Sequence, residues 1–182
     1  MSELERFLPA DQDILVGIVY RVGHWISHVD DTDISDVSEE IERKQMMAIL
    51  GKIANASKTA AIVRDLAAEA LRQTGSWNRW EKQSMSVEQD IAAAAKLMKG
   101  QSTDEEYKSF ANALMVIATA VARAFREEPE NKPEHENYFS WLSEKAGELV
   151  LSIKDKSAHK DMNISPAEDT ALTELHNMLW NA

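Results

Sequence analysis

Apolar residues recur at steps of three and four along this chain, and that spacing constrains its fold more than any other feature. The clearest run covers residues 15–29, and the same steps return over residues 110–124 and 139–153. Because an α-helix turns about 100° per residue, side chains spaced in this way share one helix face. We find no alternation of apolar and polar residues of the kind that predicts a half-buried strand. The pattern therefore predicts an all-α protein.

Helix-breaking residues are scarce, which predicts that the helices are long. The chain has 6 glycines and 4 prolines among 182 residues, about half of the roughly 12% that average usage would supply. Weaker apolar stripes over residues 41–53, 62–70 and 87–98 bring the prediction to about seven helices. No break between them is long or biased enough in composition to separate two domains. We therefore expect residues 1–182 to form a single all-helical domain.

One predicted helix, over residues 105–126, should be the buried centre of the bundle. Within residues 110–125 the only polar residues are Asn112, Thr119 and Arg123. These three are separated by seven and four positions and fall on one narrow strip, so the rest of the helix surface is apolar. With 16 residues and a charge among them, this stretch is too short and too polar to span a bilayer.

A capping box marks the start of the last helix. Ser165 stands at the N-cap position, Pro166 at the first helical position and Glu168 at the third. The serine hydroxyl and the glutamate carboxylate can each accept a hydrogen bond from a backbone N–H that the helix leaves unpaired. The sequence therefore predicts a helix that begins at Pro166.

Two tryptophans, Trp77 and Trp80, lie one turn apart beside a predicted break at Gly75–Ser76. Aromatic rings near a loop usually cover the core, and we expect that here. The alternative is an exposed pair that binds a partner.

Charge and composition exclude several classes of function. Lys and Arg number 20 against 31 Asp and Glu, which gives a formal net charge of −11. Nucleic acid binding draws on clustered cations, so we expect no nucleic acid partner. The absence of cysteine excludes thiolate zinc sites and cysteine nucleophiles. The acidic start lacks the apolar core of a signal peptide, which predicts a cytoplasmic protein with no membrane span.

The acids are concentrated in two clusters. Residues 30–42 contain seven carboxylates and no cation, and residues 127–136 contain five more. We predict that both clusters follow the C-terminal end of a helix, where negative charge is unfavourable. Either water and salt screen them, or a divalent cation does. The candidate carboxylate ligands in the first cluster are Asp30, Asp31, Asp33, Glu39 and Glu42.

The spacing in the first cluster is similar to that of an EF-hand calcium loop. With Asp31 at position 1, oxygen donors fall at positions 3, 5, 7, 9 and 12, and Glu42 takes the last. An EF-hand needs Gly at position 6 and an apolar residue at position 8, whereas this chain has Asp36 and Ser38. The sequence therefore favours a looser carboxylate site over an EF-hand.

His24 and His28 add nitrogen donors beside this cluster. Their H-x3-H spacing allows two imidazoles on one helix to face the same metal ion. By helical angle they share a strip with Gly17 and Arg21, which we expect to be the accessible edge of the apolar face. The alternative is that both rings pack at the core boundary and form hydrogen bonds with nearby carboxylates. Ca²⁺, Mg²⁺ and Zn²⁺ are the candidate ions.

A short motif occurs twice and carries a family resemblance. Residues 31–35 read D-T-D-I-S and residues 161–165 read D-M-N-I-S, with Glu39 and Glu168 following. This pattern resembles the Asp-Gly-x-Ile-Ser motif of the TerB-like family of tellurite resistance proteins, although Thr32 and Met162 stand where the family has Gly. The resemblance implies a single all-helical domain whose acidic patches chelate metal ions, in a family linked to stress responses. The residues to which it points are Asp31, Ile34, Ser35 and Glu39, and Asp161, Ile164, Ser165 and Glu168.

No catalytic motif accompanies these features. The chain contains neither a glycine-rich phosphate loop nor an H-E-x-x-H zinc motif. We therefore expect a non-enzymatic helical protein that binds divalent cations. The alternative is a protein-interaction module whose acidic face binds a basic partner.

Overall fold

The computed structural model describes residues 2–29, 36–124 and 164–181, with only the backbone described for residues 36–42, 84, 123 and 124. No strand occurs in these ranges. Three short 3-10 helices are present: η1 (Glu3–Arg6), η2 (Thr74–Ser76) and η3 (Ser84–Ser86). The α-helices in these ranges are α1 (Pro9–His28), α2 (Asp36–Asn55), α3 (Ala61–Arg72), α4 (Trp77–Glu81), α5 (Val87–Gln101), α6 (Asp104–Ala124) and α9 (Pro166–Trp180). The helix predicted over residues 139–153 lies outside the described residues.

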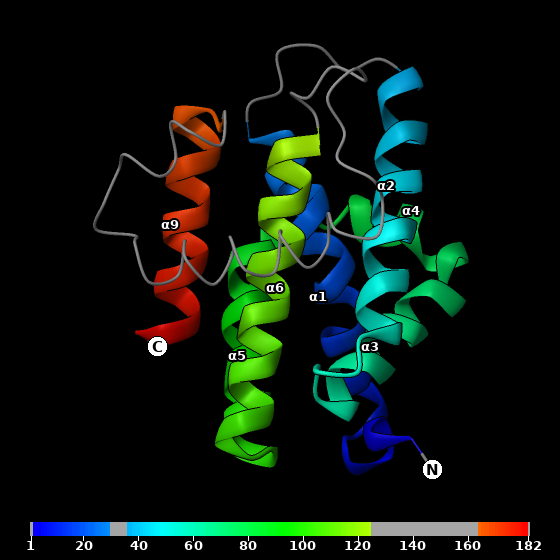
Figure 1. Cartoon of the computed structure of the whole chain (residues 1–182), viewed down its shortest axis with the longest axis vertical. Coiled ribbons are helices and arrows are strands. Elements are labelled where there is room, and N and C mark those ends of the chain that lie inside the picture. Colours follow the sequence, from blue (N-terminus) through cyan, green and yellow to red (C-terminus); the bar gives the residue numbers. More distant parts are fainter. Residues whose placement is uncertain (1, 30–35, 125–163, 182) are drawn as a thin grey trace.

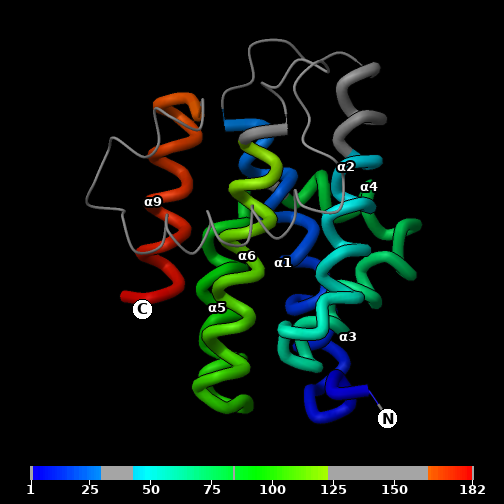
Figure 2. Tube along the Cα trace, viewed as in Figure 1, coloured from blue at the N-terminus to red at the C-terminus, as the bar shows by residue number. Residues whose placement is uncertain are grey.

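The helices form one bundle with α1 and α6 side by side at its centre (Figure 1). α5 packs against both of them and continues into α6 as an antiparallel pair (Figure 2). α9 covers α5 and α6 on one side, while α2, α3 and α4 lie on the other. Buried residues from all seven α-helices of the described ranges belong to one hydrophobic cluster. The predicted all-α single-domain bundle is thereby confirmed.

The predicted central helix is buried almost all round. From Phe110 to Ala122 of α6, Asn112 is the one exposed residue. α1 is equally enclosed, because every residue from Leu15 to Gly23 is buried. The apolar stripe of α1 predicted a single buried face for α1. Its polar side is buried as well because α4 and η3 pack across it.

Two glycines allow this close packing around α1. A Cβ atom at Gly23 would lie 2.5 Å from the Met46 Sδ of α2 and 3.2 Å from a methyl carbon of Ile117 in α6. A Cβ atom at Gly17 would lie 3.2 Å from the Trp80 indole nitrogen. A larger residue at Gly23 would require the Met46 side chain to shift, and one at Gly17 would press on the Trp80 ring.

The two tryptophans cover the core, as predicted. Trp77 and Trp80 are 2% and 1% exposed. The ring of Tyr20 stacks on Trp77 with the centroids 4.3 Å apart, and the Trp77 indole donates to the carbonyl oxygen of Ala70 at 3.0 Å. The exposed partner-binding pair is therefore excluded.

The capping box of α9 is confirmed. The Ser165 hydroxyl accepts from the Glu168 N–H at 3.1 Å, and the Glu168 carboxylate accepts from the Ser165 N–H at 2.8 Å. Both residues are buried. The serine and the acid of the second D-x-[D/N]-I-S motif therefore have a structural role. In the first motif Glu39 follows Ser35 by four positions instead of three, so that copy lacks the spacing of a capping box.

Within the described residues, no helix combines the length and the apolar character that crossing a bilayer requires.

Candidate functional site

The predicted histidine pair is brought together at the end of α1. The rings of His24 and His28 have their centroids 4.0 Å apart and their planes inclined by 50°. The Nδ1 atom of His28 lies 2.8 Å from the His24 carbonyl oxygen and 2.8 Å from the Ser27 hydroxyl. A carbonyl oxygen only accepts, so Nδ1 carries the proton in that contact and Nε2 is the basic nitrogen of the neutral ring. Histidines that bind metal ions commonly have this arrangement.

His24 is held in its neutral form at neutral pH. The pKa of His24 is lowered from the ordinary 6.5 to about 4, mainly by burial and next by the electrostatic interaction with the neighbouring His28. Arg43 and Arg21 lower the pKa further, whereas the Glu81 carboxylate opposes them. The neutral imidazole is the form that binds a metal ion.

A polar network from three helices lies beside His24. The Tyr20 hydroxyl donates to the Glu81 carboxylate at 2.6 Å, and the Arg43 guanidinium contacts both oxygens of the same carboxylate at 3.0 and 2.6 Å. Burial alone would raise the pKa of Glu81, but the hydrogen bonds from Arg43 and Tyr20 lower it below its ordinary value. The ionised Glu81 thus joins α1, α2 and α4.

Sequence analysis missed this network. Tyr20 stands four positions before His24, so its place on the same side of α1 was predictable. Arg43 and Glu81 are separated by 38 positions, and no local pattern indicates that they meet.

A small cavity of about 10 Å³ opens next to His24. Tyr20, Ser27 and Gln45 contribute polar atoms to its wall. The Gln45 side-chain oxygen is buried, and no described residue donates a hydrogen bond to it. The volume is that of one water molecule, and the polar wall suits it.

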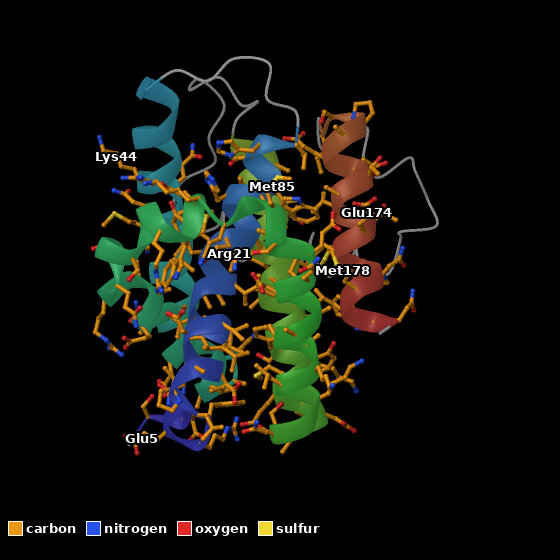
Figure 3. All side chains as sticks on the ribbon, turned by 180° about the vertical axis from the view of Figure 1, so that it is seen from behind. Glu5, Arg21, Lys44, Met85, Glu174 and Met178 are labelled. Carbon is orange, nitrogen blue, oxygen red and sulfur yellow. The ribbon has the colours of Figure 1, made fainter. Side chains whose placement is uncertain are left out.

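The expectation that Gly17 and Arg21 mark an accessible edge is wrong. Arg21 is 4% exposed and Gly17 is buried. Figure 3 shows Arg21 on α1, near the middle of the bundle in this view. Its guanidinium forms an ion pair with Asp90 at 2.5 Å and donates to the Gln83 carbonyl oxygen at 2.5 Å. The strip is therefore covered up to Arg21, while the imidazoles of His24 and His28 are half-buried.

The predicted carboxylate ligands lie outside the side chains that the structure describes. Asp30, Asp31 and Asp33 lie outside the described residues, as does the second acidic cluster at residues 127–136. Glu39 and Glu42 belong to α2, but their side chains are not described. Within the described part of the chain, no three His, Asp or Glu side chains converge as a metal site.

The helix boundary changes the electrostatics expected of the first acidic cluster. α2 begins at Asp36, so four of the seven carboxylates occupy its first two turns. Negative charge is favourable in the first turn of a helix, which here holds Asp36 and Glu39. The prediction that the whole cluster follows a helix C-terminus, where it would be unfavourable, is wrong for these four residues: Asp36, Glu39, Glu40 and Glu42.

The same boundary excludes a regular EF-hand loop. Position 6 of that register is Asp36, the first residue of α2, and the carbonyl oxygen expected at position 7 belongs to Val37 within the helix. Carbonyl oxygens within a helix accept hydrogen bonds from the N–H four residues onward and do not turn toward a central ion. The departures at Asp36 and Ser38 agree with this finding.

Comparison of the chain with models of known protein families, with curated proteins and with solved structures found no match.

The pKa of His24 predicts that acid destabilises the fold. In the unfolded chain this residue takes up a proton near pH 6.5, but in the folded chain only near pH 4. Between these values the unfolded state binds more protons, so stability falls as the pH falls. From pH 7.5 to pH 5 we expect His24 to account for a loss of about 2 kcal/mol in the free energy of unfolding.

Urea unfolding of the wild type and of His24→Gln at both pH values measures this contribution. The variant should lose less stability on acidification than the wild type. Burial also lowers the pKa of His176, so His176→Gln is expected to remove a separate share of the pH dependence. An unchanged pH dependence in His24→Gln would contradict the assignment.

Proposed function

We propose that this chain is a non-enzymatic helical protein that binds a divalent cation at the His24–His28 pair, with carboxylates of the segment that follows as further ligands. The arrangement that carries the proposal is the pair itself. The two rings are adjacent, Nδ1 of His28 is engaged with a backbone carbonyl, and burial keeps His24 neutral. Under this proposal His28 binds through Nε2. Binding of one ion by both histidines requires the two rings to rotate away from each other, because the ligands of a tetrahedral metal ion approach it from separate directions.

The histidines favour Zn²⁺ over Ca²⁺ or Mg²⁺. Imidazole nitrogen suits zinc, whereas calcium and magnesium take oxygen ligands. The candidate oxygen ligands are those that the sequence predicts: Asp30, Asp31, Asp33, Glu39 and Glu42. Asp30 follows His28 by two positions, so the distance along the chain is short enough for it to share an ion with the pair.

The resemblance to TerB-like proteins supports the same function. Its first motif, from Asp31 to Ser35, directly follows the helix that carries the histidines. A role in the cell's response to tellurite or metal stress is part of this proposal. The competing function, an acidic face that binds a basic protein partner, needs no metal ion, and the experiment below separates the two.

Thermal unfolding in the presence of Zn²⁺, Ca²⁺ or Mg²⁺ tests the proposal. An ion that binds only the folded chain stabilises it by about 1.4 kcal/mol at ten times its Kd. For a domain of this size we expect the melting temperature to rise by about 3 to 6 °C. Zn²⁺ should produce the largest rise, and His24→Ala or His28→Ala should remove it. His176→Ala is the matched control and should leave the rise unchanged.

A second pair of substitutions tests the carboxylates. In the double variant Asp31→Asn, Asp33→Asn the ion-dependent rise should disappear, while the metal-free protein should be no less stable than the wild type because like charges have been removed. If the ion-dependent rise in melting temperature persists in this double variant but is lost in His28→Ala, the histidines are ligands and Asp31 and Asp33 are not. A response that survives every substitution would place the site at residues 127–136. No response to any ion would refute cation binding and favour the protein-interaction function.

A further inference from the structure

A groove of about 370 Å³ opens between α6 and the junction of α2 with α3. It shares no lining residue with the cavity beside His24. On α6 its wall follows one helix face, with Glu105, Lys108, Asn112 and Val116 at steps of three and four. The opposite wall includes Lys58 and Thr59 of the connection between α2 and α3. This volume lies within the usual range for small-molecule sites.

The floor of the groove is apolar. Ile53, Ala113 and Val116 form it, and they are 2%, 7% and 7% exposed. All three residues lie within α2 or α6, and Ile53 and Ala113 belong to the hydrophobic core cluster, so the floor does not depend on a loop. A ligand with an apolar part would find a preformed surface there.

The rim carries an excess of positive charge in a strongly acidic chain. Two lysines, Lys58 and Lys108, and one carboxylate, Glu105, line the groove. Both lysines are exposed, and no described carboxylate lies within ion-pairing distance of either ammonium group. Over the whole chain, by contrast, acidic residues outnumber basic residues by 31 to 20. An unneutralised lysine pair therefore makes this groove a local attractor for anions.

Neutral donors complete the rim. The Ser109 hydroxyl oxygen accepts from the Ala60 N–H at 3.0 Å, a bond that ties the connection between α2 and α3 to α6. That oxygen retains its own proton, which it can donate to a ligand. Thr59 and Asn112 add a hydroxyl and an amide to the same lining.

We propose that this groove binds a small organic anion, with Lys58 and Lys108 holding a phosphate or carboxylate group and Ile53, Ala113 and Val116 contacting its apolar part. The combination of paired ammonium groups, hydroxyl and amide donors and an apolar floor matches a ligand that is charged at one end only. Phosphate and carboxylate share this chemistry, because both accept hydrogen bonds from lysine. The proposal is independent of cation binding at His24 and His28.

Phenyl phosphate is a suitable probe because it combines both parts. Backbone amide NMR spectra of the full chain are recorded during titration with phenyl phosphate, inorganic phosphate, benzoate or benzyl alcohol. We expect saturable shifts at Lys58, Thr59, Ser109 and Asn112 with phenyl phosphate. Its Kd should be at least about tenfold lower than that of inorganic phosphate, because only the organic anion uses the apolar floor. Benzyl alcohol, which has no charge, should cause no saturable shift.

Matched charge variants identify the groove as the site. The double variant Lys58→Gln, Lys108→Gln should weaken phenyl phosphate at least about tenfold. The control Lys82→Gln, Lys96→Gln changes the net charge equally at two exposed lysines outside the groove and should bind as the wild type does. Tighter binding of phenyl phosphate than of benzoate assigns the charged group as phosphate, and the reverse assigns carboxylate.

Three results would overturn the proposal. One is the absence of saturable shifts at the groove up to about 10 mM probe, a concentration that detects even weak sites. Another is equal weakening by both double variants, which would mean that binding follows net charge alone. The third is equal affinity for phosphate and phenyl phosphate, which would mean that the lysines attract ions without a site for an organic ligand.

Discussion

Replacing Asp90 by alanine should lower the free energy of unfolding by about 3 kcal/mol, because it leaves the buried Arg21 guanidinium without its counter-ion. The Arg21 side chain is 5% exposed and that of Asp90 is 28% exposed. Loss of one partner of a buried pair typically costs about 3 to 5 kcal/mol. We expect the lower end of this range, because water reaches part of the Asp90 site. Urea unfolding at neutral pH measures the loss.

An exposed ion pair provides the matched control. Arg79 and Asp13 pair at 2.8 Å with side chains that are 53% and 50% exposed. Replacing Asp13 by alanine should cost less than about 1 kcal/mol, because exposed pairs contribute little. If Asp90→Ala costs no more than Asp13→Ala, Arg21 is not an enclosed charge.

A double variant separates the loss of the ion pair from the burial of an unpaired charge. Adding Arg21→Met to Asp90→Ala removes the stranded cation and fills its space with an apolar chain. The double variant should therefore be more stable than Asp90→Ala alone. Equal or lower stability would mean that the packing of Arg21, rather than its charge, determines the effect.

Truncation of the central helix should be similarly costly. Leu114 and Ile117 of α6 are fully buried, at 0% exposed, and Ile117 packs close to Gly23 of α1. Leu114→Ala or Ile117→Ala should reduce the free energy of unfolding by about 2 to 5 kcal/mol, through lost burial and the cavity left behind. A thermal scan should give a melting temperature lower by several degrees.

The control for this truncation is Met85→Ala. Met85 is 97% exposed and lies on the surface of the molecule (Figure 3). Its replacement should change stability by less than about 0.5 kcal/mol. A comparably small effect at Leu114 and at Ile117 would show that α6 is not the centre of the core.

Local sequence signals were sufficient for the helices and for some of their ends. The apolar spacing predicted α1, α5 and α6, because helix periodicity acts within a few residues. Ser165 and Glu168 predicted the start of α9, because a cap uses side chains three positions apart. The start of α6 carries the same signal, which we did not use: Thr103 and Glu106 accept from each other's backbone N–H.

The candidate site was predictable only in part. His24 and His28 meet because the H-x3-H spacing is one helix turn, which a single helix determines without help from the rest of the chain. The low pKa of His24 was not predictable, because it arises mainly from burial, and burial depends on how the other helices pack around α1. Neither the contact of Arg43 with Glu81 nor the cavity beside Gln45 has a local cause.

Arg21 illustrates why the tertiary structure was needed. Helix periodicity places Arg21 on a polar strip of α1. It gives the position of a residue around its own helix axis but not what packs against that position. Whether water or protein covers that strip depends on the path of the chain from Trp77 to Asp90, more than 50 residues later. This segment crosses α1, and Asp90, Gln83 and Ser86 accept hydrogen bonds from the two terminal nitrogens of the guanidinium there. The spacing of apolar residues along α1 therefore defined its helix and one buried face, and the packing of α4, η3 and α5 decided that its polar face is buried too.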